Sequence, residues 1–179
     1  MNLSNGFQRE QRRVALGMVS ALLLSAVVLA TLAWLPPFAM PDLPTPEARL
    51  AFTVRLDVLL FAWHGATIAN VARQRFFSIR DIGGSEQAAA SPAVLRANAV
   101  LQNTLEQAVF AFGSHLALAA QLSSRWMIML PGLVGLFCLG RALFWMGYRG
   151  GAAARAFGFA LTFYPSAGAC IVALVLLLR

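Results

Sequence analysis

The sequence predicts an all-α integral membrane protein, and three observations support that prediction. Hydrophobic residues make up 59% of the 179 residues and charged residues only 12%, about half the share that covers the surface of a soluble domain. The mean hydropathy is +0.70. Five stretches are each long and apolar enough to cross a bilayer, which takes about 20 residues of helix. A water-soluble enzyme and a disordered chain are therefore excluded.

Five spanning helices are expected, each from a run of mostly apolar residues. In chain order they cover residues 14–35, 51–71, 96–122, 126–148 and 156–178. The first and the last contain no charged residue. The middle three carry polar side chains, which are costly in lipid and need partners there.

The connections between these helices carry residues that break helices. Five prolines between Pro36 and Pro46 predict an extended first connection. Residues 78–92 are polar and contain Gly83-Gly84, which predicts the longest exposed loop. A tight turn is expected at residues 123–125, and Gly150-Gly151 separates the last two helices.

The first helix is preceded by a positively charged segment and has small residues near its end, as a secretory signal peptide does. Its apolar run nevertheless exceeds the roughly 7–15 residues of such a peptide. We therefore expect this helix to be retained, whereas cleavage would leave four spans in the same orientation.

The positive charges predict the orientation of the helices. All 14 basic residues are arginine, a usage that together with abundant alanine is typical of a GC-rich bacterial genome. One side carries Arg9, Arg12, Arg13, Arg73, Arg75, Arg80, Arg96, Arg149 and Arg155, and the other carries Arg49, Arg125 and Arg179. Because arginines concentrate in cytoplasmic loops, we expect a multi-pass protein of a bacterial inner membrane with a cytoplasmic N-terminus. The arginines are scattered between apolar runs, so no nucleic-acid interface is expected.

Polar residues of the third and fourth helices mark a candidate site. Arg96, Asn103, Glu106, Gln107 and Phe110 fall on one helical stripe. Arg141 in the fourth helix lies at a depth similar to that of Glu106, and a buried carboxylate needs a cation or several donors. We therefore expect a Glu106–Arg141 ion pair with Asn103 beside it. Such a pair either sets the register of the helices or forms part of a pocket for an anionic ligand.

The other polar residues within the helices have simpler interpretations. His64 and His115 have no partners at metal-ligand spacing, so core histidines with hydrogen bonds are expected and no metal site is predicted. Arg55 and Asp57 are expected near the outer interface, paired locally or reaching the headgroups. Arg155 begins the fifth helix, where it is either a topology charge or a site residue.

Three stretches resemble the MAPEG superfamily, the membrane-associated proteins in eicosanoid and glutathione metabolism. Residues 96–107, ending Gln-Asn-Thr-Leu-Glu-Gln, resemble its signature helix. Residues 140–148, Gly-Arg-Ala-Leu-Phe-Trp-Met-Gly-Tyr, followed by Arg155, resemble its later signature. Residues 71–76, Val-Ala-Arg-Gln-Arg-Phe, are similar to the basic end of its first helix.

The resemblance implies a four-helix membrane bundle that assembles as a homotrimer and binds glutathione between neighbouring subunits. Residues 50–179 would form this MAPEG-like domain. Residues 1–49 would be an N-terminal tail, an extra transmembrane helix and a proline-rich loop. A trimer would also cover charged residues that a small bundle cannot easily hide from lipid, namely Arg96, Glu106, Arg141 and Arg155.

The resemblance also implies roles for individual residues. Asn103 and Glu106 would hold the peptide portion of glutathione, Arg73 and Arg141 its carboxylates, and Tyr148 would complete the site. Arg155 would stabilise the thiolate, since a nearby guanidinium lowers the pKa of a thiol.

This sequence departs from the family pattern at Ala99, Leu101 and Phe144, where many active members carry polar side chains. Two hypotheses therefore stay open. One is a glutathione-dependent transferase or peroxidase acting on small apolar electrophiles, and the other is a non-catalytic protein that binds membrane lipid or a protein partner.

Overall fold

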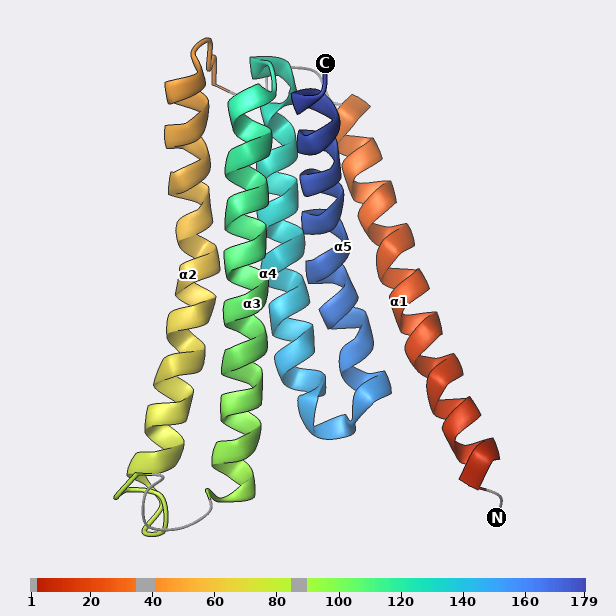
Figure 1. Ribbon diagram of the computed structural model, residues 1–179, viewed down its shortest axis with the longest axis vertical. Coiled ribbons are helices and arrows are strands. Elements are labelled where there is room, and N and C mark those ends of the chain that lie inside the picture. The colour runs from red at the N-terminus through yellow and green to blue at the C-terminus, as the bar shows by residue number, and fades with distance from the viewer. Residues whose placement is uncertain (1–2, 35–40, 85–89) are drawn as a thin grey trace.

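The computed structural model describes residues 3–34, 41–84 and 90–179, and the described chain is helical without strands (Figure 1). The elements are α1 (Leu3–Trp34), α2 (Pro46–Phe76), α3 (Pro92–Gln121), the short 3-10 helix η2 (Ser124–Ile128), α4 (Met129–Gly147), the 3-10 turn η3 (Tyr148–Gly150) and α5 (Ala152–Leu177). The predicted all-α fold and its five long helices are confirmed.

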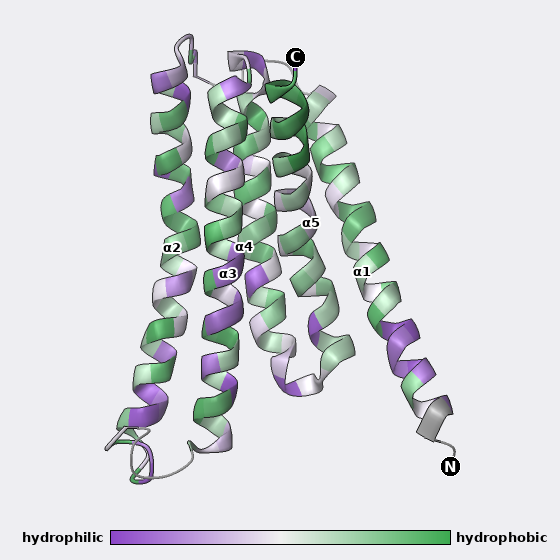
Figure 2. Cartoon of the chain, viewed as in Figure 1, coloured by the Kyte–Doolittle hydropathy of each residue, from purple (hydrophilic) through white to green (hydrophobic). Residues whose placement is uncertain are grey.

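The five long helices run side by side with alternating direction (Figure 1). α5 packs against α4, α1 and α3, and α2 packs against α3 and α4. α1, α3 and α5 begin at the same end of the bundle, where α2 and α4 finish. Hydrophilic residues gather at this end of α1, α2 and α3 (Figure 2), and we call it the arginine-rich end.

Local signals explain where α2 and α3 begin. The hydroxyl of Thr45 accepts a hydrogen bond from the Ala48 N–H at 3.2 Å, and Pro46 opens α2. Ser91 caps α3 in the same way, and Pro92 follows it. Proline suits a first helical position because its missing N–H would have no helical partner there. Both helices therefore extend beyond their predicted apolar runs, and Pro92 belongs to α3 rather than to the loop.

α1 begins well before the predicted apolar run and includes the basic lead at Arg9, Arg12 and Arg13. Near its start, the Glu10 carboxylate accepts a hydrogen bond from the Ala153 N–H at 3.1 Å. This contact satisfies a free N–H in the first turn of α5. α1 is therefore docked on α5 by a polar contact as well as by apolar packing. The part of the predicted extended connection that contains Pro36-Pro37 lies outside the described residues.

Within the described residues, three helical stretches are long and apolar enough to cross a membrane: Asn5–Trp34, Ser124–Gly150 and Ala152–Leu177. α2 and α3 have similar lengths and pack alongside them, but they carry more polar residues (Figure 2). Five membrane crossings therefore remain a prediction, whereas an integral membrane bundle is directly supported.

Candidate functional site

The guanidinium of Arg141 lies at the centre of a buried polar cluster. Arg141 is 1% exposed. Its Nε and Nη2 donate to the Thr162 hydroxyl at 3.1 and 3.0 Å, and its Nη1 donates to Asn103 Oδ1 at 2.9 Å. Its Cζ lies 4.5 Å from the centre of the Phe144 ring, a favourable cation–π distance. Arg141 thus links α4 to α3 and α5.

The predicted Glu106–Arg141 ion pair is wrong. Glu106 is exposed, and its Oε1 accepts a hydrogen bond from Gln102 Nε2, one turn earlier in α3, at 3.0 Å. Arg141 instead uses neutral oxygens. The physical reason is the rotation of α3, which turns Asn103 towards Arg141 and leaves the Glu106 carboxylate outside the core of the single chain.

A cavity of about 560 Å³ opens beside this cluster, and we call it the Glu106 cavity. It brings together four of the six predicted site residues: Asn103 and Glu106 from α3, Tyr148 at the end of α4, and Arg155 from α5. Val14 and Met18 of α1, Ala99 and Gln102 of α3, Phe144 of α4, and Ala152, Ala156 and Phe159 of α5 complete the wall. The lining of the cavity therefore combines polar and apolar side chains.

Arg155 is held over an aromatic ring inside this cavity. Its Cζ lies 4.5 Å from the centre of the Tyr148 ring, and Tyr148 in turn contacts the Phe144 ring edge-on at 5.4 Å. Arg155 is half-buried, so its guanidinium can be shared between the ring and a ligand. It lies in the first turn of α5, as predicted, and its side chain lines the Glu106 cavity.

The remaining two predicted site residues lie elsewhere. Arg141 is enclosed by its own partners. Arg73 lines a second cavity of about 320 Å³ at the arginine-rich end, which we call the arginine cavity. Tyr148 lines both cavities. Within one chain, neither Arg73 nor Arg141 therefore lines the Glu106 cavity.

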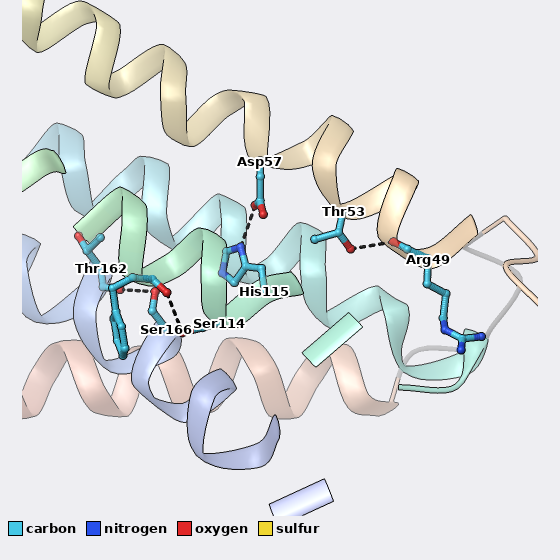
Figure 3. Close-up of polar contacts among 8 residues, drawn as sticks. Arg49, Thr53, Asp57, Ser114, His115, Thr162 and Ser166 are labelled. Carbon is cyan, nitrogen blue, oxygen red and sulfur yellow. Dashed lines mark hydrogen bonds and ion pairs between the residues drawn. The ribbon is translucent and has the colours of Figure 1, made fainter. Parts of the chain in front are cut away.

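Sequence reasoning missed a buried pair on the other side of the bundle. Asp57 of α2 and His115 of α3 are both 0% exposed, with Asp57 Oδ1 and His115 Nδ1 2.8 Å apart (Figure 3). The expected local pairing or headgroup contact of Asp57 is wrong, because its Oδ1 contacts His115 of another helix inside the bundle. The prediction for His115 is confirmed, whereas His64 is half-buried and its Nδ1 has no hydrogen-bond partner among the described residues. Asp57 and His115 are separated from the α2–α3 connection by similar numbers of residues. This similarity was the sequence signal that could have predicted the pair.

A third cavity lies towards the opposite end, between α1, α3 and α5, and we call it the outer cavity. Its volume is about 700 Å³. Its walls include Leu22 and Leu29 of α1, Leu118 of α3 and Val172 of α5. Such a surface suits an apolar chain.

Comparisons with known proteins agree with this architecture. The model of the MAPEG family matches residues 50–175. The mouse (Mus musculus) and cattle (Bos taurus) proteins named transmembrane protein 79 are each 28% identical over 161 residues, which is 88% of this chain and 39% of the relative. The chain thus spans about two fifths of the length of these curated relatives. No solved structure matches it. The family match, covering most of the helical bundle, shows that this integral membrane protein belongs to the MAPEG family.

Proposed function

We propose that the protein binds glutathione in the Glu106 cavity and transfers it to small apolar electrophiles that enter from the membrane. One observation carries the proposal: Asn103, Glu106, Tyr148 and Arg155, from three helices, line a single cavity. Its volume of about 560 Å³ lies within the roughly 300–1,000 Å³ of small-molecule sites.

The two charged residues of the cavity complement a zwitterionic peptide. The exposed Glu106 carboxylate is available for the ammonium group of glutathione, and the amides of Gln102 and Asn103 lie on the same face of α3. Arg155 is the cation that would lie beside the sulfur of glutathione. A guanidinium beside a thiol favours the thiolate, which is the nucleophilic form.

The chemistry that follows is a nucleophilic displacement. The thiol proton leaves to solvent, the thiolate sulfur forms a bond to the electrophilic carbon, and the displaced group departs with the electrons of the broken bond. The apolar lining residues Val14, Met18 and Phe159 would hold the electrophile beside the sulfur. Arg155 is the catalytic residue in this proposal.

Calorimetry of glutathione binding to the purified protein in detergent tests the proposal. Binding in the millimolar range or tighter is expected, with weaker binding in Glu106→Gln. Arg155→Ala should mainly raise the pKa of the bound thiol, measured by ultraviolet absorbance of the thiolate. Arg12→Ala is a matched control, because Arg12 is exposed on α1 and lines neither the Glu106 cavity nor the arginine cavity. Absence of glutathione binding to the wild type would contradict the proposal.

We also propose that the protein assembles as a homotrimer. Glu106 is exposed in the single chain although it lies well inside α3, and a neighbouring subunit would shield its charge from lipid. Arg141 gives no such support, because its own chain already buries it. Cross-linking in mild detergent should give three copies, and a folded monomer would contradict this assembly.

A second candidate function is non-catalytic lipid binding, and the outer cavity favours it. This cavity is larger than the Glu106 cavity and mostly apolar in lining. Ala99 and Phe144 also place non-hydrogen-bonding side chains in the Glu106 cavity. Phospholipid that co-purifies with the protein, is lost in Leu29→Trp, and is accompanied by no glutathione binding would favour this function.

A further inference from the structure

The arginine cavity lies where α2 and α4 end and α3 begins. It is lined by one arginine from each of three segments: Arg73 of α2, Arg96 of α3 and Arg149 of η3. Its other polar side chains are Asn70, Gln74, Trp145 and Tyr148, and no lining residue carries a carboxylate. The cavity therefore concentrates positive charge.

The three arginines have few partners within the chain. Arg73 Nη2 donates to Asn70 Oδ1, a neutral oxygen, at 3.2 Å. Arg96 and Arg149 make no side-chain hydrogen bond or ion pair in the described part of the chain. Like charges that converge without a counter-charge repel one another, and a bound anion removes this cost.

The donors of this cavity suit a phosphate group. Guanidinium groups bind phosphate oxygens through two parallel N–H donors. The lining of the cavity also includes the amide of Gln74 and the hydroxyl of Tyr148 as additional donors. A volume of about 320 Å³ is at the lower end of small-molecule sites, which favours a compact headgroup.

The last residue of α2 and the segment that follows it add a second observation. Phe76 is 68% exposed, Phe77 79% and Ile79 99%. Exposed apolar side chains next to a basic cavity, at the end of a membrane helix, are the surface that acyl chains of an anionic lipid would cover. We propose that the arginine cavity binds a phosphate group, carried by an anionic phospholipid or by a free phosphate compound. The arginine cavity is distinct from the Glu106 cavity proposed for glutathione, although Tyr148 lines both.

The test uses the full-length protein in detergent and two ligand sources. One arm measures retention of phosphatidylglycerol against phosphatidylcholine by native mass spectrometry. The other measures the shift in Tm with inorganic pyrophosphate against chloride at equal ionic strength. Preferential retention of phosphatidylglycerol assigns the lipid source, and stabilisation by pyrophosphate assigns a free phosphate.

The decisive variant is Arg96→Gln/Arg149→Gln, since neither residue belongs to the Glu106 cavity. Binding should weaken on the order of tenfold or more, since tenfold corresponds to about 1.4 kcal/mol. The matched control Arg12→Gln/Arg13→Gln removes the same charge at the same end of the bundle. It should change binding far less. Arg96→Lys/Arg149→Lys should be intermediate, because lysine keeps the charge but loses the paired donors.

Three results would overturn the proposal. One is equal retention of the two phospholipids together with no effect of pyrophosphate. Another is an equal loss in the control variant, which would show a general effect of surface charge. The third is that Arg96→Gln/Arg149→Gln and Arg96→Lys/Arg149→Lys both keep the wild-type Tm and bind phosphatidylglycerol and pyrophosphate as well as the wild type does.

Discussion

At the scale of single residues, the polar core is held by partners that the helices bring together. Three N–H groups of Arg141 donate hydrogen bonds, two to Thr162 and one to Asn103. The Thr162 hydroxyl in turn donates to the Gly158 carbonyl of its own helix at 2.8 Å. In lipid no water is available to replace such partners. The stability of the bundle should therefore be sensitive to each of them.

Thr162→Val should lower the stability, because it removes the acceptor of two guanidinium bonds while keeping the shape of the side chain. The expected loss is about 1–3 kcal/mol in the free energy of unfolding. Thr53→Val is the control, since the buried Thr53 hydroxyl bonds only the Arg49 carbonyl of its own helix. Thermal unfolding in detergent compares the two. Equal losses would show that the Arg141 contacts contribute little.

Asp57 and His115 should depend on each other. Leaving a buried polar group without its hydrogen-bond partner costs about 1–3 kcal/mol, so Asp57→Leu and His115→Leu should each lower the Tm. The double variant should recover much of the loss, because it leaves no unpaired polar group. A thermal double-mutant cycle measures this coupling. Strictly additive losses would contradict the interaction.

At the scale of elements, the connections and the helix crossings depend on a few contacts. Asp81 anchors the loop after α2 to the start of α3, because its carboxylate accepts from the Ser78 hydroxyl and from the Ser91 N–H at 2.8 Å. These bonds hold the pKa of Asp81 at about 2, below its usual 3.8. Close contact between α4 and α5 depends on small residues, since a Cβ at Gly158 would overlap the Phe144 backbone nitrogen.

The α2–α3 connection should loosen in acid. A depressed carboxyl pKa contributes stability that is present above pH 3.8 and is lost as the pH falls towards 2. Limited proteolysis by pepsin should therefore cut this connection more rapidly at pH 2 than at pH 4, relative to Asp81→Asn under the same conditions. If the cleavage rate of the wild type divided by that of Asp81→Asn were the same at pH 2 and pH 4, this role of Asp81 would be contradicted.

Gly158→Ala should destabilise the packing of α4 on α5, because backbone atoms occupy the space that the new methyl group needs. Gly168→Ala is the control within the same helix, since nothing lies within 4 Å of a Cβ there. That control should be neutral or stabilising by up to about 1 kcal/mol, the difference in helix propensity. A rise in Tm for both variants would show that the crossing adapts.

At the scale of the whole molecule, the alternating helices place two of the three candidate ligand cavities near one end. The arginine cavity and the Glu106 cavity share Tyr148, whereas the outer cavity lies towards the opposite end. The arginine count predicts that the end with the two polar cavities faces the cytoplasm. Cytoplasmic glutathione or phosphate would then reach these cavities directly.

Cysteine labelling tests this orientation in a background with Cys138→Ala and Cys170→Ala. Ile82, 64% exposed, lies in the loop at the arginine-rich end, and Leu178, 87% exposed, lies at the other. An impermeant maleimide added to intact cells should label Leu178→Cys and should label Ile82→Cys only after lysis. The reverse pattern would invert the topology and move both polar cavities outside.

The sequence by itself determined the number of long helices, their approximate ends and the arginine-rich end. These features are local, because they follow from runs of apolar residues and from proline, glycine and cap residues. It also identified four residues of the Glu106 cavity. Only the tertiary structure decided that Arg141 meets Thr162 rather than Glu106, that Asp57 meets His115, and that Arg73 lines a separate cavity. When a helix is apolar on most faces, the periodicity of its apolar residues does not determine how the helix is rotated about its axis. Packing against the neighbouring helices sets that rotation and therefore selects the partner of each buried polar side chain.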